Sequence, residues 1–191
     1  MVAAPHPSAR FTFNELSAAT EGRWIETDKA DTAVASVSLT TDSRSIQPGQ
    51  MFLALVGERF DGHQFVDQAF QAGAAGAIVT EDAWAQHPEW GQYPHLRVVP
   101  DTTAAYLQVA RAHRRRLPHL KVVAITGSAG KTTAKDMFYQ AFKAVMPTQK
   151  TEQNFNNEIG VSQTLLSVQP ETALVIVEMG MRGLNQIRLL T

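Results

Sequence analysis

One stretch, residues 122–133, constrains the fold of this chain of 191 residues more than any other. It reads Val-Val-Ala-Ile-Thr-Gly-Ser-Ala-Gly-Lys-Thr-Thr, and its first four residues have the apolar character of a buried strand. Two glycines then bracket two small residues, and Lys-Thr-Thr begins a helical pattern. This order predicts a phosphate-binding loop, because the glycines let successive N–H groups point into one concavity and the helix N-terminus adds its unpaired donors.

Two residues of the loop have the chemistry that a nucleoside triphosphate needs. Lys131 would reach the β- and γ-phosphates, and the hydroxyl of Thr132 would bind Mg²⁺. The loop is a shorter form of the general pattern G-x-x-x-x-G-K-[ST], since Ile125 stands where the first glycine would be. The alternative is a strand–turn–helix link that uses glycine only for its tight turn, but Lys-Thr-Thr at a helix start has no folding rationale of its own.

The composition excludes several classes of function. A net charge of −1 creates no global field that would attract nucleic acid or an anionic membrane, and without cysteine the chain forms no disulfide, thiolate nucleophile or Cys-based metal site. The sequence has no run of about 18 apolar residues, so we expect no membrane span. Residues 1–10 hold two prolines and no apolar core, which indicates a disordered start rather than a signal peptide. We expect a cytoplasmic monomer.

Alternating strand and helix patterns predict an α/β fold. Strands are expected at residues 11–13, 34–39, 51–55, 77–79, 97–99, 122–125, 148–152 and 173–177. Helices are expected at residues 14–19, 63–72, 102–117, 131–145, 158–166 and 184–190. Pro118 stops the third helix just before the phosphate-loop strand, so we place a domain boundary there. A small N-terminal α/β domain would occupy residues 11–118, and the first part of a parallel-sheet P-loop domain residues 119–191.

The second domain looks incomplete. Only two or three strands follow residue 121, whereas a nucleotide-binding fold of this kind normally needs about five or more. We therefore expect its missing part beyond Thr191, and we expect these 191 residues alone to be inactive.

A second chemical signal is Glu178, which directly follows the apolar run at residues 173–177. An acid at the carboxyl end of a parallel strand, after a phosphate loop, is the place for a carboxylate that organises Mg²⁺. The glycines at positions 180 and 183 would let the backbone approach a ligand closely. The alternative is an exposed acid at a strand end with no ligand.

Three asparagines occupy four positions at residues 154–157, which is unusual for a plain loop. Amide side chains both donate and accept hydrogen bonds, so Asn156 and Asn157 are suited to hold a substrate as well as neighbouring backbone. Asn157 also stands where a helix cap belongs. We interpret this segment as a helix cap combined with ligand contact.

The first half offers weaker signals. Ser43 and Arg44 present a hydroxyl and a guanidinium to a polar ligand, although a solvated loop with an Asx-type turn is the competing interpretation. His63 stands at a helix start, where it either caps the helix at the rim of the core or contacts a ligand. The three arginines at residues 114–116 complement a helix dipole at its C-terminus, which we favour over a nucleic-acid patch.

These motifs resemble those of the Mur ligases. In the second half the resemblance rests on the phosphate loop at residues 126–133, the asparagine-rich segment at residues 154–161 and Val-Glu-Met-Gly-Met-Arg-Gly at residues 177–183. In the first half it rests on Thr-Asp-Ser-Arg at residues 41–44, Pro-Gly at residues 48–49 and Asp-Gly-His-x-Phe at residues 61–65. The resemblance covers nearly all of the chain from about residue 11. Ala129 is a mild departure, since the family often has Asn there.

The resemblance implies an ATP-dependent amide ligase of peptidoglycan precursor synthesis. It is strongest to the members that join D-alanyl-D-alanine to UDP-N-acetylmuramoyl-tripeptide through an acyl phosphate, with the first domain holding the UDP end. ATP would bind the loop residues, namely Gly127, Ser128, Ala129, Gly130, Lys131, Thr132 and Thr133. Lys131 would be catalytic, and Thr132 with Glu178 would hold Mg²⁺. The substrate contacts would be Ser43, Arg44, Asn156 and Asn157.

Two other functions stay open. One is a different ligase of the same superfamily, such as a diaminopimelate- or lysine-adding enzyme or a folylpolyglutamate synthetase, although Glu-Met-Gly at residues 178–180 and the asparagine-rich segment argue against it. The other is a nucleotide-binding module without catalysis. A generic P-loop kinase finds no support in the N-terminal domain.

Overall fold

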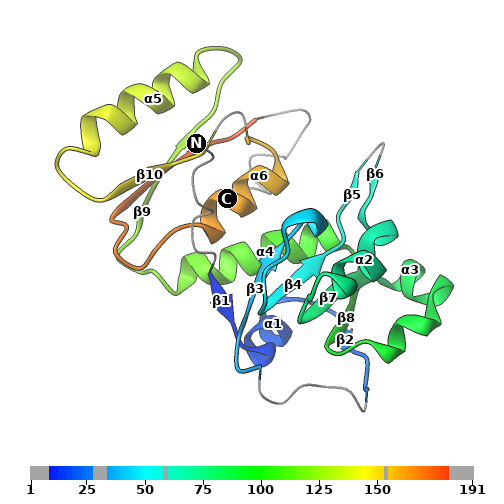
Figure 1. Ribbon diagram of the computed structural model, residues 1–191. Helices are drawn as coiled ribbons and strands as arrows, with labels where there is room; N and C mark the ends of the chain where they lie inside the picture. Colours follow the sequence, from blue (N-terminus) through cyan, green and yellow to red (C-terminus); the bar gives the residue numbers. More distant parts are fainter. Residues whose placement is uncertain (1–8, 28–33, 58–59, 153–154, 181–191) are drawn as a thin grey trace. The chain divides into compact units, whose positions relative to one another are not determined.

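The computed structural model describes residues 9–27, 34–57, 60–152 and 155–180 (Figure 1). Its helices and strands alternate along the chain, so the predicted α/β fold class is confirmed. Packing divides the chain into two compact units, one at Arg10–Gln108 and one that includes the residues from Val109 onward. The division falls within the long helix α4 (Thr102–Arg115), and the domain boundary that the sequence places at residue 118 stays a prediction.

The first unit is built on a six-stranded sheet in the order β1-β3-β4-β7-β8-β2. Its strands are β1 (Arg10–Phe11), β2 (Arg23–Trp24), β3 (Val37–Thr40), β4 (Gln50–Leu53), β7 (Gly76–Thr80) and β8 (Leu96–Val99). The four central strands are parallel, and β1 and β2 join the two edges in antiparallel pairing. Nearly every residue of the central strands is buried, which explains why the sequence shows short continuous apolar runs there.

Short helical segments link these strands. They are α1 (Phe13–Ala19), η1 (Ser43–Ser45), η2 (Gly62–Phe65), α2 (Val66–Gln71), α3 (Glu81–Gln86) and η3 (Pro88–Gln92), with α4 following β8. A separate hairpin is made of β5 (Val56–Gly57) and β6 (Phe60–Asp61). The helix expected at residues 63–72 is therefore a 3₁₀ turn followed by α2, and Gly73 after it has a φ of +95°, as a left-handed helix end requires.

The start of α1 differs from the expectation. Thr12 caps the helix in place of Asn14, because its Oγ1 accepts the N–H of Glu15 at 3.2 Å while the Glu15 carboxylate accepts the N–H of Thr12 at 2.7 Å. This reciprocal pair of bonds satisfies two backbone donors at once, which a cap at Asn14 would not. The strand expected at residues 11–13 consequently ends at Phe11.

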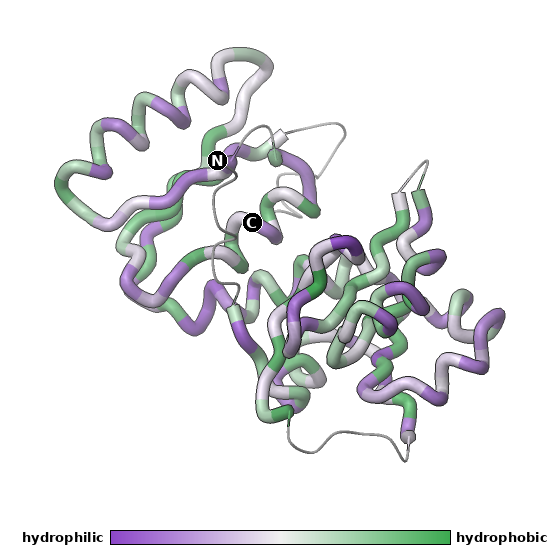
Figure 2. Tube along the Cα trace, in the orientation of Figure 1, coloured by the Kyte–Doolittle hydropathy of each residue, from purple (hydrophilic) through white to green (hydrophobic). Residues whose placement is uncertain are grey.

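Helix α3 and the turn η3 were not predicted. Thr80 caps α3 by accepting the N–H of Ala83 at 3.3 Å, and Glu81 and Asp82 lie in the first turn, where acids complement the helix dipole. A capping threonine followed by two acids was therefore a usable signal. Trp90 of η3 is 2% exposed and joins the core of the unit with Phe52, Val79, Leu96 and Val98. Hydrophobic residues run along the central strands (Figure 2), and each such large side chain contributes about 1.5–3 kcal/mol on burial.

The second unit contains a three-stranded parallel sheet in the order β10-β11-β9. Its elements are β9 (Lys121–Ile125), α5 (Lys131–Phe142), β10 (Thr148–Lys150), α6 (Glu158–Leu166) and β11 (Leu174–Glu178). All five residues of β11 are buried, and Glu178 is the last of them, one residue further than the expected end of this strand. On α5, Met137, Phe138 and Val145 just beyond its end are 68%, 44% and 73% exposed. The helix expected at residues 184–190 lies outside the described residues.

None of the helices within the described ranges has the length and apolar character that a bilayer crossing requires.

Alanine in place of Gly22 is expected to destabilise the first unit more than alanine in place of Gly73. Both glycines have positive φ, +119° and +95°, so alanine costs about 1–2 kcal/mol at either one. A Cβ at Gly22 would also lie 2.1 Å from the carbonyl oxygen of Val98, whereas a Cβ at Gly73 would meet nothing within 4 Å. Urea unfolding followed by fluorescence reports this unit, because all three tryptophans lie in it: Trp24, Trp84 and Trp90. Equal losses in the free energy of unfolding for the two alanine variants would contradict the steric argument.

Candidate functional site

Ser43 and Arg44 lie in the first unit, in and around the turn η1. The Arg44 N–H donates to Asp42 Oδ1 at 3.0 Å, which makes the Asx-type turn that the sequence offered as an alternative. The Arg44 guanidinium also donates to both Asp42 oxygens, at 2.8 and 2.9 Å, and its side chain is 82% exposed. These side-chain hydrogen bonds are the main reason that the pKa of Asp42 is lowered. Ser43 is buried, so of the two residues Arg44 offers the more accessible group.

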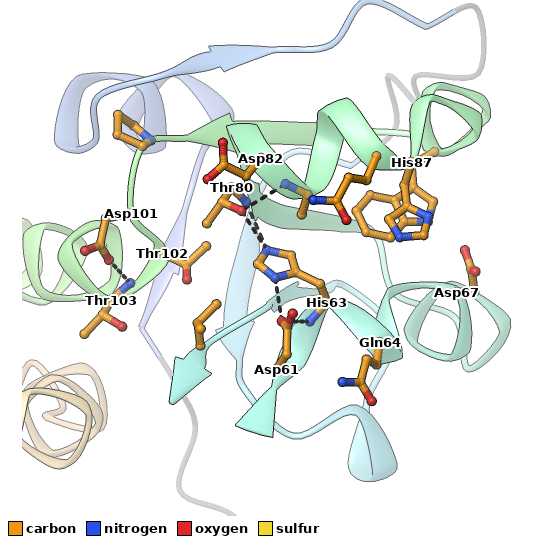
Figure 3. Close-up of a pocket in the computed structure, with 15 residues that line it drawn as sticks. Asp61, His63, Gln64, Asp67, Thr80, Asp82, His87, Asp101, Thr102 and Thr103 are labelled. Carbon is orange, nitrogen blue, oxygen red and sulfur yellow. Dashed lines mark hydrogen bonds and ion pairs between the residues drawn. The ribbon is translucent and has the colours of Figure 1, made fainter. Parts of the chain in front are cut away.

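A cavity of about 680 Å³ opens elsewhere in the first unit (Figure 3). Its lining includes four carboxylates, those of Asp61, Asp67, Asp82 and Asp101, and includes neither Ser43 nor Arg44. Sequence reasoning missed this cavity because its residues come from separate stretches that only the fold brings together. Carboxylates repel the negative charge of a diphosphate. The acidic lining therefore does not support this cavity as the site for the UDP end of a substrate.

His63 lines this cavity but is held from both sides. Its Nε2 accepts the backbone N–H of Thr80 at 3.1 Å, so the neutral ring carries its proton on Nδ1 and donates it to Asp61 Oδ1 at 2.7 Å. Burial would raise the pKa of Asp61, but hydrogen bonds from the backbone and side chain of His63 outweigh burial and lower the pKa. His63 is 7% exposed, and its contacts support the interpretation as a residue at the core rim.

The phosphate loop joins the end of β9 to the start of α5. Gly127 and Gly130 have φ values of +150° and +74°, which residues with a side chain rarely adopt. A Cβ at Gly130 would meet no atom within 4 Å, so backbone conformation rather than packing requires glycine there. The strand–turn–helix order predicted from the sequence is confirmed.

Lys131 is the first residue of α5, and its ammonium folds back over the loop. Nζ donates to the carbonyl oxygen of Gly127 at 2.8 Å, which keeps the positive charge beside the turn. Gly130 is the N-cap residue of α5 and has no side chain, so the first N–H groups of the helix receive no side-chain cap. Unpaired helix donors next to an ammonium favour an anion at this point.

Glu178 lies at the same edge of the sheet as the loop. In the parallel ladder it pairs with Ile125, the last residue before the loop, and the next N–H, that of Met179, donates to the Ile125 carbonyl at 2.9 Å. Parallel strands end at a common edge, so this register brings the carboxylate to the loop. A slip of one residue would turn the side chain to the other face of the sheet.

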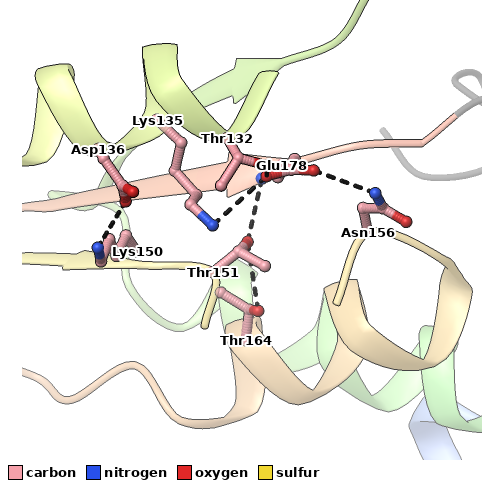
Figure 4. Close-up of polar contacts among 8 residues, drawn as sticks. All are labelled: Thr132, Lys135, Asp136, Lys150, Thr151, Asn156, Thr164 and Glu178. Carbon is pink, nitrogen blue, oxygen red and sulfur yellow. Dashed lines mark hydrogen bonds and ion pairs between the residues drawn. The ribbon is translucent and has the colours of Figure 1, made fainter. Parts of the chain in front are cut away.

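Within the described part of the chain, three side chains contact the Glu178 carboxylate (Figure 4). Thr132 Oγ1 donates to Oε2 at 3.0 Å, and Lys135 Nζ lies 3.4 Å from the same oxygen. Asn156 Nδ2 donates to Oε1 at 3.1 Å. The structure thus brings together Thr132 and Glu178, the two residues expected to hold Mg²⁺, and adds Asn156 to them.

The ionisation of Glu178 follows from these contacts. Burial by itself would raise the pKa of the carboxyl group, because the charged form loses its hydration. Hydrogen bonds from Asn156 and Thr132, together with the positive charge of Lys135, outweigh burial and hold the pKa below its ordinary value. The group is therefore a carboxylate at neutral pH, although Glu178 is only 1% exposed.

The donor atoms fit a hard divalent cation. A hydroxyl and a carboxylate are oxygen ligands, which Mg²⁺ prefers. Among the residues that the structure describes, no group of three or more His, Cys, Asp or Glu is placed to hold a metal. Mg²⁺ usually takes one or two protein oxygens and completes its shell with water and phosphate, so Thr132 and Glu178 beside a phosphate loop meet its needs.

Asn156 and Asn157 have different surroundings. Asn157 caps α6, since its Oδ1 accepts the N–H of Gly160 at 2.9 Å. Asn156 contacts Glu178, and its carbonyl accepts the N–H of Gly180 at 2.7 Å. A Cβ at Gly180 would lie 2.9 Å from the Asn156 side-chain oxygen, which explains a glycine there. The cap expected for Asn157 is confirmed, and Asn156 is the one that reaches the predicted metal ligand.

Sequence reasoning missed two residues of this site. Lys135 lies three residues after Thr132, which puts both side chains on one face of α5. Thr151 follows β10, and its Oγ1 accepts the backbone N–H of Glu178 at 3.0 Å. The helical spacing was available in the sequence for Lys135, whereas the position of Thr151 depends on the pairing of β10 with β11.

Replacing Glu178 by glutamine is expected to cost more stability at neutral than at acidic pH. The folded pKa lies below the ordinary value of 4.5, so the carboxylate contributes stability that is full above that value and is lost as the pH falls through the folded pKa. The loss in free energy of unfolding, measured by urea and far-UV circular dichroism, should therefore shrink from about pH 7 to about pH 3. The same substitution at the exposed Glu171 is the control. A loss independent of pH would contradict the assignment.

Comparisons with known proteins identify a family for this chain. The model for the "Mur ligase family, catalytic domain" matches residues 37–131, and that for the "Mur ligase middle domain" matches residues 125–191. The UDP-N-acetylmuramoyl-tripeptide–D-alanyl-D-alanine ligase of Synechocystis sp. is 40% identical over 153 residues, which are 80% of this chain and 33% of that protein. This chain thus spans about a third of the length of that relative.

Solved structures show the same likeness. MurF from Acinetobacter baumannii superimposes with a TM-score of 0.85 at 35% identity, covering 96% of this chain and 39% of that one. MurF ligase from Thermotoga maritima, solved in complex with ADP, superimposes with a TM-score of 0.68 at 27% identity, covering 84% of this chain and 35% of that one. Because the two family models together match residues 37–191, and these relatives align with most of the chain, this chain belongs to the Mur ligase family.

Proposed function

We propose that this chain carries the nucleotide site and the UDP-substrate-binding part of a ligase that joins D-alanyl-D-alanine to UDP-N-acetylmuramoyl-tripeptide. The observation that supports this most is the hydrogen bond from Thr132 to Glu178 at the end of the phosphate loop, in a chain of this family. The reaction belongs to peptidoglycan precursor synthesis, and we place it in the cytoplasm, where ATP is available.

The proposed chemistry has two steps. A carboxylate oxygen of the muramoyl peptide attacks the γ-phosphorus of ATP, and ADP leaves, so that an acyl phosphate forms. The amine of D-alanyl-D-alanine then attacks the acyl carbon, loses a proton and expels inorganic phosphate, which completes the amide. Each step is a displacement in which positioning and electrostatic stabilisation supply most of the rate.

The main barrier is the approach of one anion to another. Lys131 and the loop N–H groups provide fixed positive charge where the phosphates would lie. Mg²⁺ bound by Thr132 and Glu178 would neutralise phosphate charge further. Because Glu178 is buried and ionised, its carboxylate is ready before the nucleotide binds.

The other proposed contacts come from both compact units. Gly127, Ser128, Ala129, Gly130 and Thr133 would bind the phosphates through the turn and the first turn of α5. Asn156 would reach the substrate or the nucleotide beside Glu178, and Asn157 would act mainly by holding the start of α6. Ser43 and Arg44 would contact the UDP end, with the exposed guanidinium as the stronger contact.

Lys131→Ala is expected to weaken ATP binding by about 10- to 100-fold, the value of one charge-assisted hydrogen bond to phosphate. Titration calorimetry on this chain measures the affinity. Lys143→Ala is the matched control, because that lysine lies at the other end of α5, over the ring of Tyr139. Unchanged ATP affinity in Lys131→Ala would count against the phosphate loop.

The same variant separates an enzyme from a binding module. In a protein that joins this chain to the residues its relatives carry beyond this region, Lys131→Ala should abolish ADP release that depends on D-alanyl-D-alanine. Binding of the UDP-linked peptide should persist. ADP release that needs a different amine would instead identify another ligase of the superfamily.

Arg44→Ala is expected to weaken binding of UDP-N-acetylmuramoyl-tripeptide by about tenfold and to leave ATP affinity unchanged, because the guanidinium would pair with anionic or carbonyl oxygens of the UDP end. Fluorescence or calorimetric titration gives both affinities. Arg23→Ala is the control, since that arginine is likewise paired with an acid, Glu81, at 2.9 Å, and its side chain is 53% exposed. Equal effects of the two substitutions would show that only general charge matters.

A further inference from the structure

Lys135 is an unusual residue for its position. It is 2% exposed and is the one buried residue among those of α5. Lysine is almost never fully buried unless it is paired, because removing an ammonium from water is costly. The function of the phosphate loop does not account for this lysine, since Lys131 already provides the ammonium at the loop.

The partner of Lys135 is the carboxylate of Glu178. Nζ lies 3.4 Å from Oε2, and both side chains are 2% exposed. The same oxygen accepts the hydroxyl of Thr132 at 3.0 Å. Figure 4 shows Lys135 and Thr132 reaching the carboxylate from α5 while Asn156 reaches it from the opposite side. The lysine therefore neutralises the very group that would serve as a metal ligand.

A divalent cation at this carboxylate would meet the ammonium as a like charge. Like charges within about 4–6 Å oppose each other by one or more logarithmic units in a binding or ionisation equilibrium. The effect is large where water is excluded, because screening is weak there. Without the cation the lysine is instead the attractive partner, and it compensates a buried anion that would otherwise be expensive.

We propose that Lys135 is a positioning residue that holds the Glu178 carboxylate at the phosphate loop before the metal ion arrives, and that it lowers the affinity of the site for that ion. This inference rests on the proposed metal role of Thr132 and Glu178. A site with moderate affinity releases its ion together with the spent nucleotide, whereas an uncompensated buried carboxylate would retain it.

The chain offers a matched control pair. Lys150 lies 2.6 Å from Asp136, which is also on α5, and this pair is more exposed, at 30% and 48%. It does not include Thr132 or Glu178. Lys150→Met therefore removes a lysine–carboxylate pair from the same unit without touching the proposed ligands.

The test is a titration of Mn²⁺ into this chain saturated with ADP, with free Mn²⁺ followed by electron paramagnetic resonance and binding to ADP alone subtracted. Lys135→Met and Lys135→Gln should bind Mn²⁺ about tenfold more tightly than the unaltered chain. Lys135→Arg, which keeps the charge, and Lys150→Met should remain within about twofold. The melting temperature of Lys135→Met should fall without Mn²⁺ and recover part of the loss with it.

The outcomes are distinguishable. Unchanged or weaker Mn²⁺ affinity in both neutral variants would overturn the proposal, as would a loss of melting temperature that Mn²⁺ does not reduce. Failure of both neutral variants to fold, with Lys135→Arg folded, would show a purely structural lysine and overturn it too. Absence of protein-bound Mn²⁺ in the unaltered chain would instead remove the metal role of Thr132 and Glu178, and with it the basis for the inference.

Discussion

The pairing of β11 with β9 is the constraint on which the nucleotide site depends. It pairs Glu178, the last residue of β11, with Ile125, the last residue of β9. The carboxylate therefore lies beside the phosphate loop that follows β9. Hydrogen bonds of a parallel ladder repeat evenly, and side chains alternate between faces, so the register alone decides that this carboxylate reaches the loop. The hydrogen bond from the Met179 N–H to the Ile125 carbonyl extends the pairing one residue past the end of β11, next to the phosphate loop.

Two lysines of α5, Lys131 and Lys135, place positive charge near the phosphate loop and the Glu178 carboxylate. Lys131 begins α5, and its ammonium donates to the backbone carbonyl of Gly127, beside the place where a phosphate would lie. Lys135, one helical turn later, is buried and forms an ion pair with Glu178. Both lysines lie on α5 and carry a positive charge, but Lys135 is the more buried of the two. The more accessible Lys131 would contact the ligand, whereas the buried Lys135 would hold the Glu178 carboxylate in place.

Much of the fold and part of the site could be predicted from the sequence because the signals were local. Strands such as β4, β7 and β11 are short apolar runs, and the loop is a contiguous motif whose glycines have the required positive φ. The prediction failed where two local signals competed, as at Thr12 and Asn14, or where a helix of six residues, α3, had too few turns to show a period.

The sequence by itself determined the α/β class, the phosphate loop and the cap at Asn157, because each depends on residues that are neighbours along the chain. Only the tertiary structure decided that Asn156 and Lys135 join Thr132 at the Glu178 carboxylate and that Asp61 and Thr80 hold His63 between them. Most of those contacts join residues far apart in the sequence, as between Asn156 and Glu178 or between His63 and Thr80. Such contacts depend on which elements pack together, and local pattern does not carry that information.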